Sequence, residues 1–425
     1  MKKTLSLVLA LLCAVAIIGF ARGKSEVVNV DFWLYGGTPQ NVALYHQLVD
    51  TWNKDHPNIQ VKITDQVWAT VFEHYQAAIA SGNQPDVARI HSPGANQFGA
   101  VGGYLEPLDN FKDWTTVKAQ YVQGYLSAYT IKGHVWALPN TPAIFVLLGN
   151  KAMFDKAGIA KMPETWTEFR ADAKKLTVPG KQWGYAIMGG DLGGFAYRLA
   201  PLAYEAGGVA LNEDWTKSQF NTPAWVQATQ LLADMYQKDK SVDPGWLSAG
   251  FDEVANKFAA DKVAMSIEGP WYSGTINSKK PGKELLVGVV PRPDQALGPA
   301  PQGSLFDASA VVISSKSKHK AEAWEWMKYM TGPIADVNFA KNPDLGGLPV
   351  ITASLSDPAW PKYLGYAAYS ASGPTVRAWP YHPSLTDIVQ NVLAVTASKA
   401  IKGDMTVQAA FQQIDDQTNA ILAKK

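Results

Sequence analysis

One stretch near the start of the chain, residues 27–90, decides the fold class. It reads VVNVDFWLYGGTPQNVALYHQLVDTWNKDHPNIQVKITDQVWATVFEHYQAAIASGNQPDVARI. Its hydrophobic pattern predicts a strand over 27–34, a helix through 45–52 that ends at His56-Pro57, a strand over 59–63, a helix over 71–81 and a strand over 85–90. Strand, helix, strand, helix, strand implies a parallel sheet that is covered by helices.

The residues that follow these three strands are the first candidates for a binding site. In sheets of this kind, ligands bind outside the carboxyl ends of the strands. The segments at those ends are 35–38, 65–68 and 91–94, and we take Tyr35, Trp68 and His91 from them as candidate ligand contacts. Trp68 could equally be a packing residue.

The same alternation restarts further along the chain. Strands are predicted at 144–148, 263–267, 287–290 and 310–313. Thr165 and Glu168 form the pattern of a capping box, and Thr222-Pro223 is a second helix start. No fixed-period repeat and no low-complexity linker is present. We therefore predict two α/β lobes, each a mostly parallel sheet with helices on both faces, with more than one crossing between them.

The first 21 residues have the pattern of a secretory signal peptide. Lys2 and Lys3 precede an uncharged apolar stretch over 4–18, and Gly19-Phe20-Ala21 supplies small residues for cleavage. The alternative is an N-terminal membrane anchor. We do not expect a lipid on Cys13, because Leu12 precedes it where a small residue is needed. The sequence thus predicts a periplasmic or otherwise extracytoplasmic protein.

Composition excludes several classes of protein. Removing 21 of 425 residues leaves 404 and takes Lys2 and Lys3 with it, so the formal net charge changes from +1 to −1. No basic excess points to nucleic acid. Cys13 is the single cysteine and leaves with the leader, so disulfides and thiolate sites are excluded. The 15 tryptophans, 17 tyrosines and 15 phenylalanines suggest flat aromatic binding surfaces besides core packing.

Catalytic, metal and cofactor motifs are missing from the sequence. Gly23-Lys24-Ser25 imitates the end of a phosphate-binding loop, but Ile18 stands where the upstream glycine is required. There is no His-Glu-x-x-His, no Cys-x-x-Cys and no Gly-x-Ser-x-Gly, and the seven histidines show no ligand spacing. We predict no cofactor, no metal and no enzyme activity. A pair of glycosidase carboxylates remains an open alternative.

The order of several short motifs resembles the extracellular solute-binding proteins of family 1, the maltose and multiple-sugar type of ABC transporters. These motifs run through nearly the whole chain after the leader. They are Val30-Asp31-Phe32-Trp33, the helix end Trp52-Asn53-Lys54-Asp55-His56-Pro57, Ala80-Ser81-Gly82-Asn83-Gln84-Pro85-Asp86-Val87, Gly103-Tyr104-Leu105-Glu106-Pro107-Leu108, Gly133-His134-Val135-Trp136-Ala137-Leu138-Pro139, residues 150–159, Pro163-Glu164-Thr165-Trp166, Ala264-Met265-Ser266-Ile267-Glu268-Gly269-Pro270-Trp271 and residues 320–330.

The resemblance implies a two-lobed periplasmic-binding-protein (Venus flytrap) fold. By analogy, the N-terminal lobe comprises 22–140 plus 291–345, and the C-terminal lobe comprises 141–290 plus 346–425. A mono- or oligosaccharide would bind between the lobes and pass to the permease subunits of an ABC importer. We expect a monomer. A polyol or glycerol-phosphate receptor of the same fold and a secreted carbohydrate-active enzyme are the alternatives.

The resemblance also suggests residues that contact the ligand. Trp271 follows a strand at the family's stacking position. Further candidates are Asn140 at the predicted lobe crossing, Asp191 among four glycines, and Asp307, Arg377 and Trp379 in segments that line the cleft in this family. Departures from the family are Gly149, where tyrosine is usual, and Ala143, Ile90 and Pro93, where maltodextrin receptors carry acidic or aromatic contacts. A maltodextrin ligand is therefore disfavoured.

Overall fold

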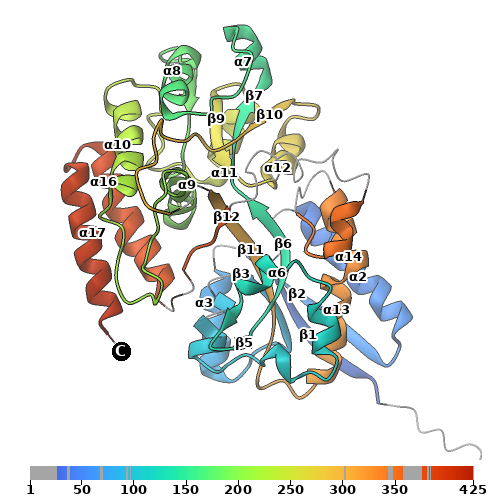
Figure 1. Cartoon of the computed structure of the whole chain (residues 1–425). Helices are drawn as coiled ribbons and strands as arrows, with labels where there is room; N and C mark the ends of the chain where they lie inside the picture. Colours follow the sequence, from blue (N-terminus) through green and yellow to red (C-terminus); the bar gives the residue numbers. More distant parts are fainter. Residues whose placement is uncertain are drawn as a thin grey trace, which may run out of the picture.

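The computed structural model describes residues 26–35, 39–67, 70–91, 94–95, 97–300, 303–342, 348–357, 376–380, 382 and 384–424. These residues form two lobes that lie end to end, with β6, β11 and β12 at the junction (Figure 1). The two lobes and the α/β class confirm the predicted fold. The leader that the sequence predicts over residues 1–21 lies outside the described part.

The first lobe is built on a sheet of mixed strand direction. Its order is β12-β11-β3-β1-β2, and β6 pairs with β11. β1 runs parallel to β2 and β3, whereas β11 runs antiparallel to β3 and β6. The strands are β1 Val28–Tyr35, β2 Ile59–Gln66, β3 Val87–His91, β6 Leu138–Ile144, β11 Ser304–Ile313 and β12 Val376–Arg377.

Helices cover both faces of this sheet. Successive side chains of a strand point to opposite faces, so neighbouring residues of β1 contact different helices. Phe32 of β1 packs on Trp326, with ring centroids 5.7 Å apart, and Trp33 packs on Tyr75 at 6.3 Å. Trp326 lies on α13 and Tyr75 on α3. The helices of this lobe are α2 Pro39–Asp55, α3 Val71–Ser81, α5 Trp114–Lys118, α6 Gln123–Ser127, α13 Lys320–Thr331 and α14 Pro333–Lys341, with short π- and 3₁₀-helical turns at Gln97–Val101, Leu108–Asn110 and Thr352–Ser356.

The second lobe is built on a sheet in the order β10-β7-β9-β8. β7 is antiparallel to β9 and β10, and only the β8–β9 pair is parallel. The prediction of a mostly parallel sheet is therefore wrong for this lobe. A fully buried strand is apolar in either direction, so the hydrophobic run could not reveal its direction. The strands are β7 Val146–Asn150, β8 Trp183–Tyr185, β9 Val263–Glu268 and β10 Leu285–Gly288.

Local start signals place the helices of the second lobe. Thr165 accepts from the Glu168 amide while the Glu168 carboxylate accepts from the Thr165 amide, which confirms the predicted capping box. Pro223 begins α10 as expected. The helices are α7 Lys151–Ala157, α8 Trp166–Leu176, α9 Leu192–Glu205, α10 Pro223–Gln237, α11 Phe251–Ala259, α12 Tyr272–Lys279, α16 Val395–Lys402 and α17 Val407–Leu422, with a π-helical turn at Asp387–Ala394.

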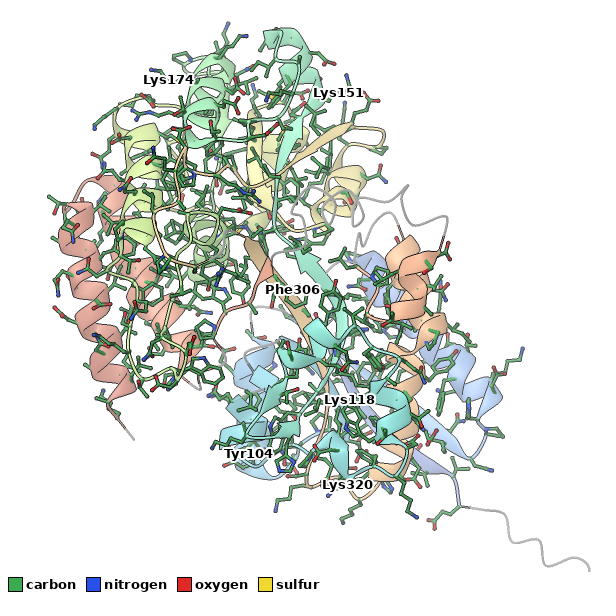
Figure 2. All side chains as sticks on the ribbon, in the orientation of Figure 1. Tyr104, Lys118, Lys151, Lys174, Phe306 and Lys320 are labelled. Carbon is green, nitrogen blue, oxygen red and sulfur yellow. The ribbon has the colours of Figure 1, made fainter. Side chains whose placement is uncertain are left out.

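The packing of the two cores suggests where the chain crosses between lobes. Ile144 and Phe306 belong to the first core, whereas Phe145 and Leu305 belong to the second. Phe306, labelled in Figure 2, stacks on Tyr125 of the first lobe at 4.8 Å. We therefore propose a first lobe of 26–144 plus 306–357 and a second of 145–305 plus 376–424, within the described residues. Strand β12 and the first two residues of β11 thus continue the sheet of the first lobe into the second lobe.

Two segments pack differently from the expected lobe boundaries. The backbone at 291–297 is bonded to the second lobe, through Arg292 to Glu164 and Leu297 to Ala206. Residues 348–351 pack in the first core. No helix in the described part of the chain is long and apolar enough to cross a membrane.

Candidate ligand-binding site

A cluster of buried polar side chains lies in the first lobe, next to the crossing strand β6. Arg89 of β3 lies at its centre and is 3 % exposed. Its Nε donates to Asn140 Oδ1 at 2.9 Å, one terminal nitrogen donates to Thr141 Oγ1 at 2.8 Å, and the other donates to the Tyr35 carbonyl. The Tyr45 hydroxyl also donates to Asn140 Oδ1. We call these five residues the Arg89 cluster.

Within the described part of the chain, the groups that hydrogen-bond to the Arg89 side chain are all neutral. Its guanidinium carbon lies 4.5 Å from the centre of the Tyr35 ring and 5.3 Å from that of Tyr45, so two aromatic rings face it. Among the described residues, no carboxylate forms an ion pair with it. Burying an arginine without a carboxylate is costly, since its hydration is lost and only dipoles replace it. Such a cost is typical of a site with a further task.

Thr141 lies in a strained conformation beside this cluster. Its φ is 44°, in the left-handed region that β-branched residues rarely occupy. The register between β6 and β11 shifts here, because Asp307 pairs with Ala143 while Ser309 pairs with Asn140. β6 thus carries a bulge of one extra residue close to the junction of the lobes. Bulges of this kind redirect side chains next to binding sites.

Tyr35 and Asp307 lie close to the same cluster. The Tyr35 hydroxyl and Ser309 Oγ are 2.7 Å apart. Burial raises the pKa of the Tyr35 phenol, the Arg89 charge opposes this rise, and the Asp307 charge adds to it. Asp307 lies on β11 and is half-buried. The structure therefore brings together three of the sequence-predicted residues, Tyr35, Asn140 and Asp307.

Trp271 lies on the second lobe where β9 leads into α12. It is half-buried, and its ring lies 5.4 Å from that of Phe145 at an interplanar angle of 82°. The indole folds back onto Gly269: a Cβ placed there would lie 2.2 Å from both Cη2 and Cζ3. Phe145 follows β6 directly, and its amide donates to the Leu305 carbonyl at 2.9 Å. Trp271 therefore contacts the segment that connects the lobes.

A buried ion pair lies beneath this aromatic contact. Arg198 of α9 donates to Glu268 at the end of β9, and the side chains are 6 % and 0 % exposed. Ser266 donates to the other Glu268 oxygen at 3.0 Å. The Arg198 guanidinium lies 5.6 Å from the centre of the Phe145 ring. Burial raises the pKa of Glu268, and the Arg198 charge opposes this rise.

The remaining predicted residues of the second lobe have structural contacts of their own. Asp191 caps α9, and its Oδ1 accepts from the Gly194 amide at 2.8 Å. Arg377 lies on β12 and is half-buried, and this burial lowers its pKa. Trp379 is 3 % exposed and packs on Tyr204 and Trp225, at 5.7 and 6.1 Å. Its position in the core is that of a packing residue.

Two predicted contacts have no side-chain description. Trp68 lies outside the described residues, and His91 is described only as the last residue of β3.

Sequence reasoning missed Arg89, although a charge inside the apolar run Val87-Ala88-Arg89-Ile90 was a usable signal. The unusual Gly149 also has an explanation, because a Cβ there would lie 2.6 Å from Met162 Sδ. Met162 fills the space beside this strand position.

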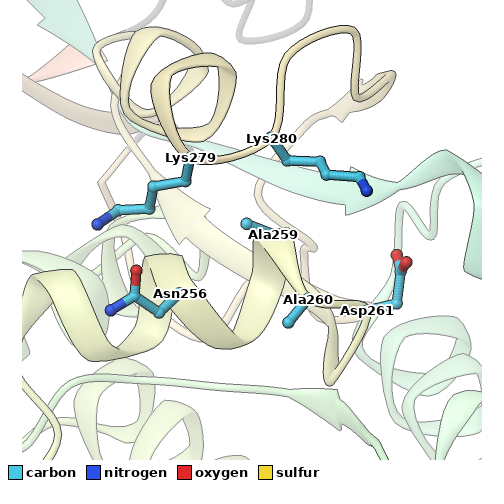
Figure 3. Close-up of a pocket in the computed structure, with 6 residues that line it drawn as sticks. All are labelled: Asn256, Ala259, Ala260, Asp261, Lys279 and Lys280. Carbon is cyan, nitrogen blue, oxygen red and sulfur yellow. The ribbon is translucent and has the colours of Figure 1, made fainter.

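One surface hollow lies away from all of these residues. It has a volume of about 350 Å³ and is lined by Asn256, Ala259, Ala260, Asp261, Lys279 and Lys280 (Figure 3). Lys279 pairs with Asp252 at 3.1 Å, and Asp261 pairs with Lys283 at 2.5 Å. Because Lys279 and Asp261 already have ion-pair partners, we assign no ligand to it. The described residues contain no group of three or more His, Cys, Asp or Glu that could hold a metal ion.

Comparison with known proteins places these features in a family. The family profile described as "Bacterial extracellular solute-binding protein" matches residues 36–336. A putative binding protein of Brucella abortus is 26 % identical over 354 residues, covering 82 % of this chain and 83 % of the relative. The multiple sugar-binding protein of Streptococcus mutans is 25 % identical over 349 residues, covering 79 % and 78 %.

Two further similarities concern other ligands. The sn-glycerol-3-phosphate-binding periplasmic protein of Pectobacterium atrosepticum is 28 % identical over 371 residues, covering 81 % of this chain and 79 % of the relative. A crystal structure of an ABC transporter solute-binding protein from Thermotoga lettingae, bound with alpha-D-tagatose, aligns with a TM-score of 0.82 at 24 % identity. That alignment covers 93 % of this chain and 100 % of the other, and it shows the fold.

Proposed function

Since the chain belongs to the bacterial extracellular solute-binding protein family, we propose that it captures a mono- or oligosaccharide between its lobes and delivers it to the permease of an ABC importer. The protein has a binding role and carries out no reaction on the ligand. It acts outside the cytoplasm as a monomer, after cleavage of the leader following Ala21.

The position of Trp271 is the observation that carries this proposal. A half-buried indole, supported edge-on by Phe145, presents flat apolar surface next to the segment that joins the lobes. A sugar ring has apolar C–H patches that stack on such a surface, and hydroxyls that need polar partners. Asn140, Asp307 and Tyr35 supply polar groups on the first lobe.

A thermal-shift screen tests the ligand class. The panel contains D-tagatose, maltose, arabinooligosaccharides, glycerol and sn-glycerol 3-phosphate. A compound at one hundred times its dissociation constant adds about 2.7 kcal/mol to the free energy of unfolding. We expect at least one sugar to raise the melting temperature. After prolonged incubation with the protein, that sugar should remain chemically unchanged. A shift with no compound, or turnover of a sugar, would contradict the proposal.

Closure of the lobes is the mechanical part of the proposal. A site formed by residues of both lobes excludes water only when the lobes meet, so the ligand favours the closed state. Small-angle scattering should show a smaller radius of gyration with the ligand bound. An unchanged radius at saturation would argue against closure.

Mass spectrometry of the exported protein checks for cleavage after Ala21 and for the absence of a lipid on Cys13.

A glycerol phosphate is the second candidate ligand. The Pectobacterium atrosepticum relative is named for sn-glycerol 3-phosphate, and this chain has a guanidinium on each side of the junction, Arg89 and Arg377. A phosphate needs charge-assisted donors of this kind. Strong competition of inorganic phosphate with sn-glycerol 3-phosphate, together with no response to sugars, would favour this candidate.

A further inference from the structure

Asn140 is a buried side chain, and the described residues use only half of its hydrogen-bonding capacity. The residue is 2 % exposed. Its Oδ1 accepts from both Tyr45 and Arg89, whereas its Nδ2 has no partner among the described residues. A buried amide nitrogen without a protein partner is costly unless water or a ligand accepts a hydrogen bond from it.

The orientation of this amide is fixed by its neighbours. Arg89 Nε can only donate, so the amide atom that faces it must be the oxygen, and the Tyr45 hydroxyl donates to the same oxygen. Turning the amide over would place its NH₂ group against the charged guanidinium, which has no acceptor. Nδ2 is therefore held on the side away from Arg89, at the bulge where β6 approaches the second lobe.

We propose that Asn140 is a hydrogen-bond donor to the ligand and that Arg89 is the positioning residue that sets its direction. This inference rests on the proposed function, and it adds a requirement on the ligand. The group that meets Asn140 has an acceptor oxygen, as in a hydroxyl, a ring ether or an anionic oxygen. A protonated amino group at that position is excluded, because it has no lone pair and would face the charge of Arg89.

The substitution Asn140→Asp separates this role from a purely structural one. The new carboxylate keeps an oxygen for Tyr45 and Arg89 and supplies the negative charge that Arg89 lacks. It also replaces the outward NH₂ by an acceptor. We therefore expect the melting temperature of the ligand-free protein to rise by about 3–6 °C while binding weakens at least tenfold.

A matched control is Asn150, a second buried asparagine, which lies at the end of β7. Its Nδ2 donates to Asp261 at 2.7 Å, so Asn150→Asp opposes two carboxylates. This variant should lower the melting temperature and leave binding unchanged. Melting is followed by circular dichroism, and maltose, D-tagatose and sn-glycerol 3-phosphate are titrated separately by calorimetry. Arg89→Lys provides a second test, since one ammonium nitrogen cannot reach the three acceptors that three guanidinium nitrogens now contact, and binding should weaken.

Each outcome decides part of the inference. A lower melting temperature for Asn140→Asp would overturn the view that Arg89 lacks a counter-charge. A stabilised variant that binds its probe as tightly as the unmodified protein would overturn the donor role. If none of the three probes binds the unmodified protein, the donor role fails. The proposed function fails with it only if the arabinooligosaccharides and glycerol of the thermal-shift panel also give no shift. The melting temperatures still decide whether Arg89 orients Asn140.

Discussion

Each lobe contains a buried arginine, and the two arginines have different hydrogen-bond partners. Arg89 in the first lobe and Arg198 in the second are 3 % and 5 % exposed, and each lies over an aromatic ring. Arg198 has the carboxylate of Glu268, whereas Arg89 has an amide, a hydroxyl and a carbonyl. The charge of Arg198 is thus neutralised within the core, and that of Arg89 continues to act on its neighbours.

This difference matches the surroundings of each arginine. The Arg198–Glu268 pair supports Phe145 and, through it, Trp271, so its contribution is to hold an apolar surface in place. Arg89 contacts the polar side chains of the crossing strand β6. One lobe thereby offers a rigid aromatic surface and the other offers oriented polar groups. A sugar suits this combination, because its ring has apolar C–H patches and its edge carries hydroxyls.

The largest effect is expected when Arg198 is deprived of its carboxylate partner and so resembles Arg89. Glu268→Gln keeps the shape of the side chain but leaves Arg198 buried without a carboxylate. We expect the free energy of unfolding in urea to fall by about 3–5 kcal/mol. Glu253→Gln is the control, because Glu253 pairs with Lys257 at the surface and is 47 % exposed. That change should cost less than about 1 kcal/mol. Equal losses in the two variants would contradict the comparison.

Glu205 is an intermediate case and gives the next largest effect. Its carboxylate is fully buried and pairs with Arg292 at 2.7 Å, but Arg292 is 38 % exposed. Burial raises the pKa of Glu205 to about 7, above its value of about 4.5 in the unfolded chain. The folded state therefore binds the proton more tightly, and stability falls as the pH rises from about 4.5 to about 7.

Glu205→Gln should remove this dependence on pH. The unfolding free energy of the unmodified protein, relative to the variant, should fall by at most about 3 kcal/mol across that range. Urea unfolding of both proteins at pH 4.5, 6 and 8 measures it. A difference that grows with pH in favour of the unmodified protein would show that Arg292 outweighs burial.

Sequence reasoning reached most of the elements but only part of the site. Helix 71–81 and the Thr165 capping box were predictable, because their signals are local. Strand direction in the second lobe was not, since an apolar run has the same appearance in either direction. The lobe boundaries expected from the family missed the packing of 291–297 and 348–351, which depends on contacts between distant segments.

The candidate site residues also divide into those with a local sequence signal and those that depend on contacts between distant segments. Trp271 and Asn140 were chosen from their places in the chain, and the structure gives them surroundings that suit a ligand contact. Trp379 was expected near the cleft, but Tyr204 and Trp225 enclose it. The importance of Arg89 depends on Tyr45 and Thr141, which lie 44 and 52 positions away in the sequence. No local pattern joins them.

Trp271→Ala tests whether the indole surface near the Arg198–Glu268 ion pair binds the ligand. Loss of the indole should weaken binding by about 1–3 kcal/mol, by analogy with other aromatic stacking surfaces. The ligand-free protein should lose about 1 kcal/mol of stability, because the ring is half-buried and contacts Phe145 at its edge. Calorimetry and urea unfolding measure the two separately. Trp225→Ala, at a fully buried ring, should cost about 3–5 kcal/mol of stability. Unchanged affinity with a large loss of stability would assign Trp271 to the core.

The smallest expected effect concerns the position of that indole. Gly269→Ala would place a Cβ 2.2 Å from two ring carbons of Trp271, so the ring must move outward. The indole remains present but no longer lies against the backbone, and we expect binding to weaken about fivefold, or about 1 kcal/mol. Gly124→Ala is the control, because a Cβ there meets no atom within 4 Å. A double variant with Trp271→Ala completes the test. If Gly269 acts only by positioning the indole, the double variant should bind as weakly as Trp271→Ala alone, whereas additive losses would show that residue 269 touches the ligand itself.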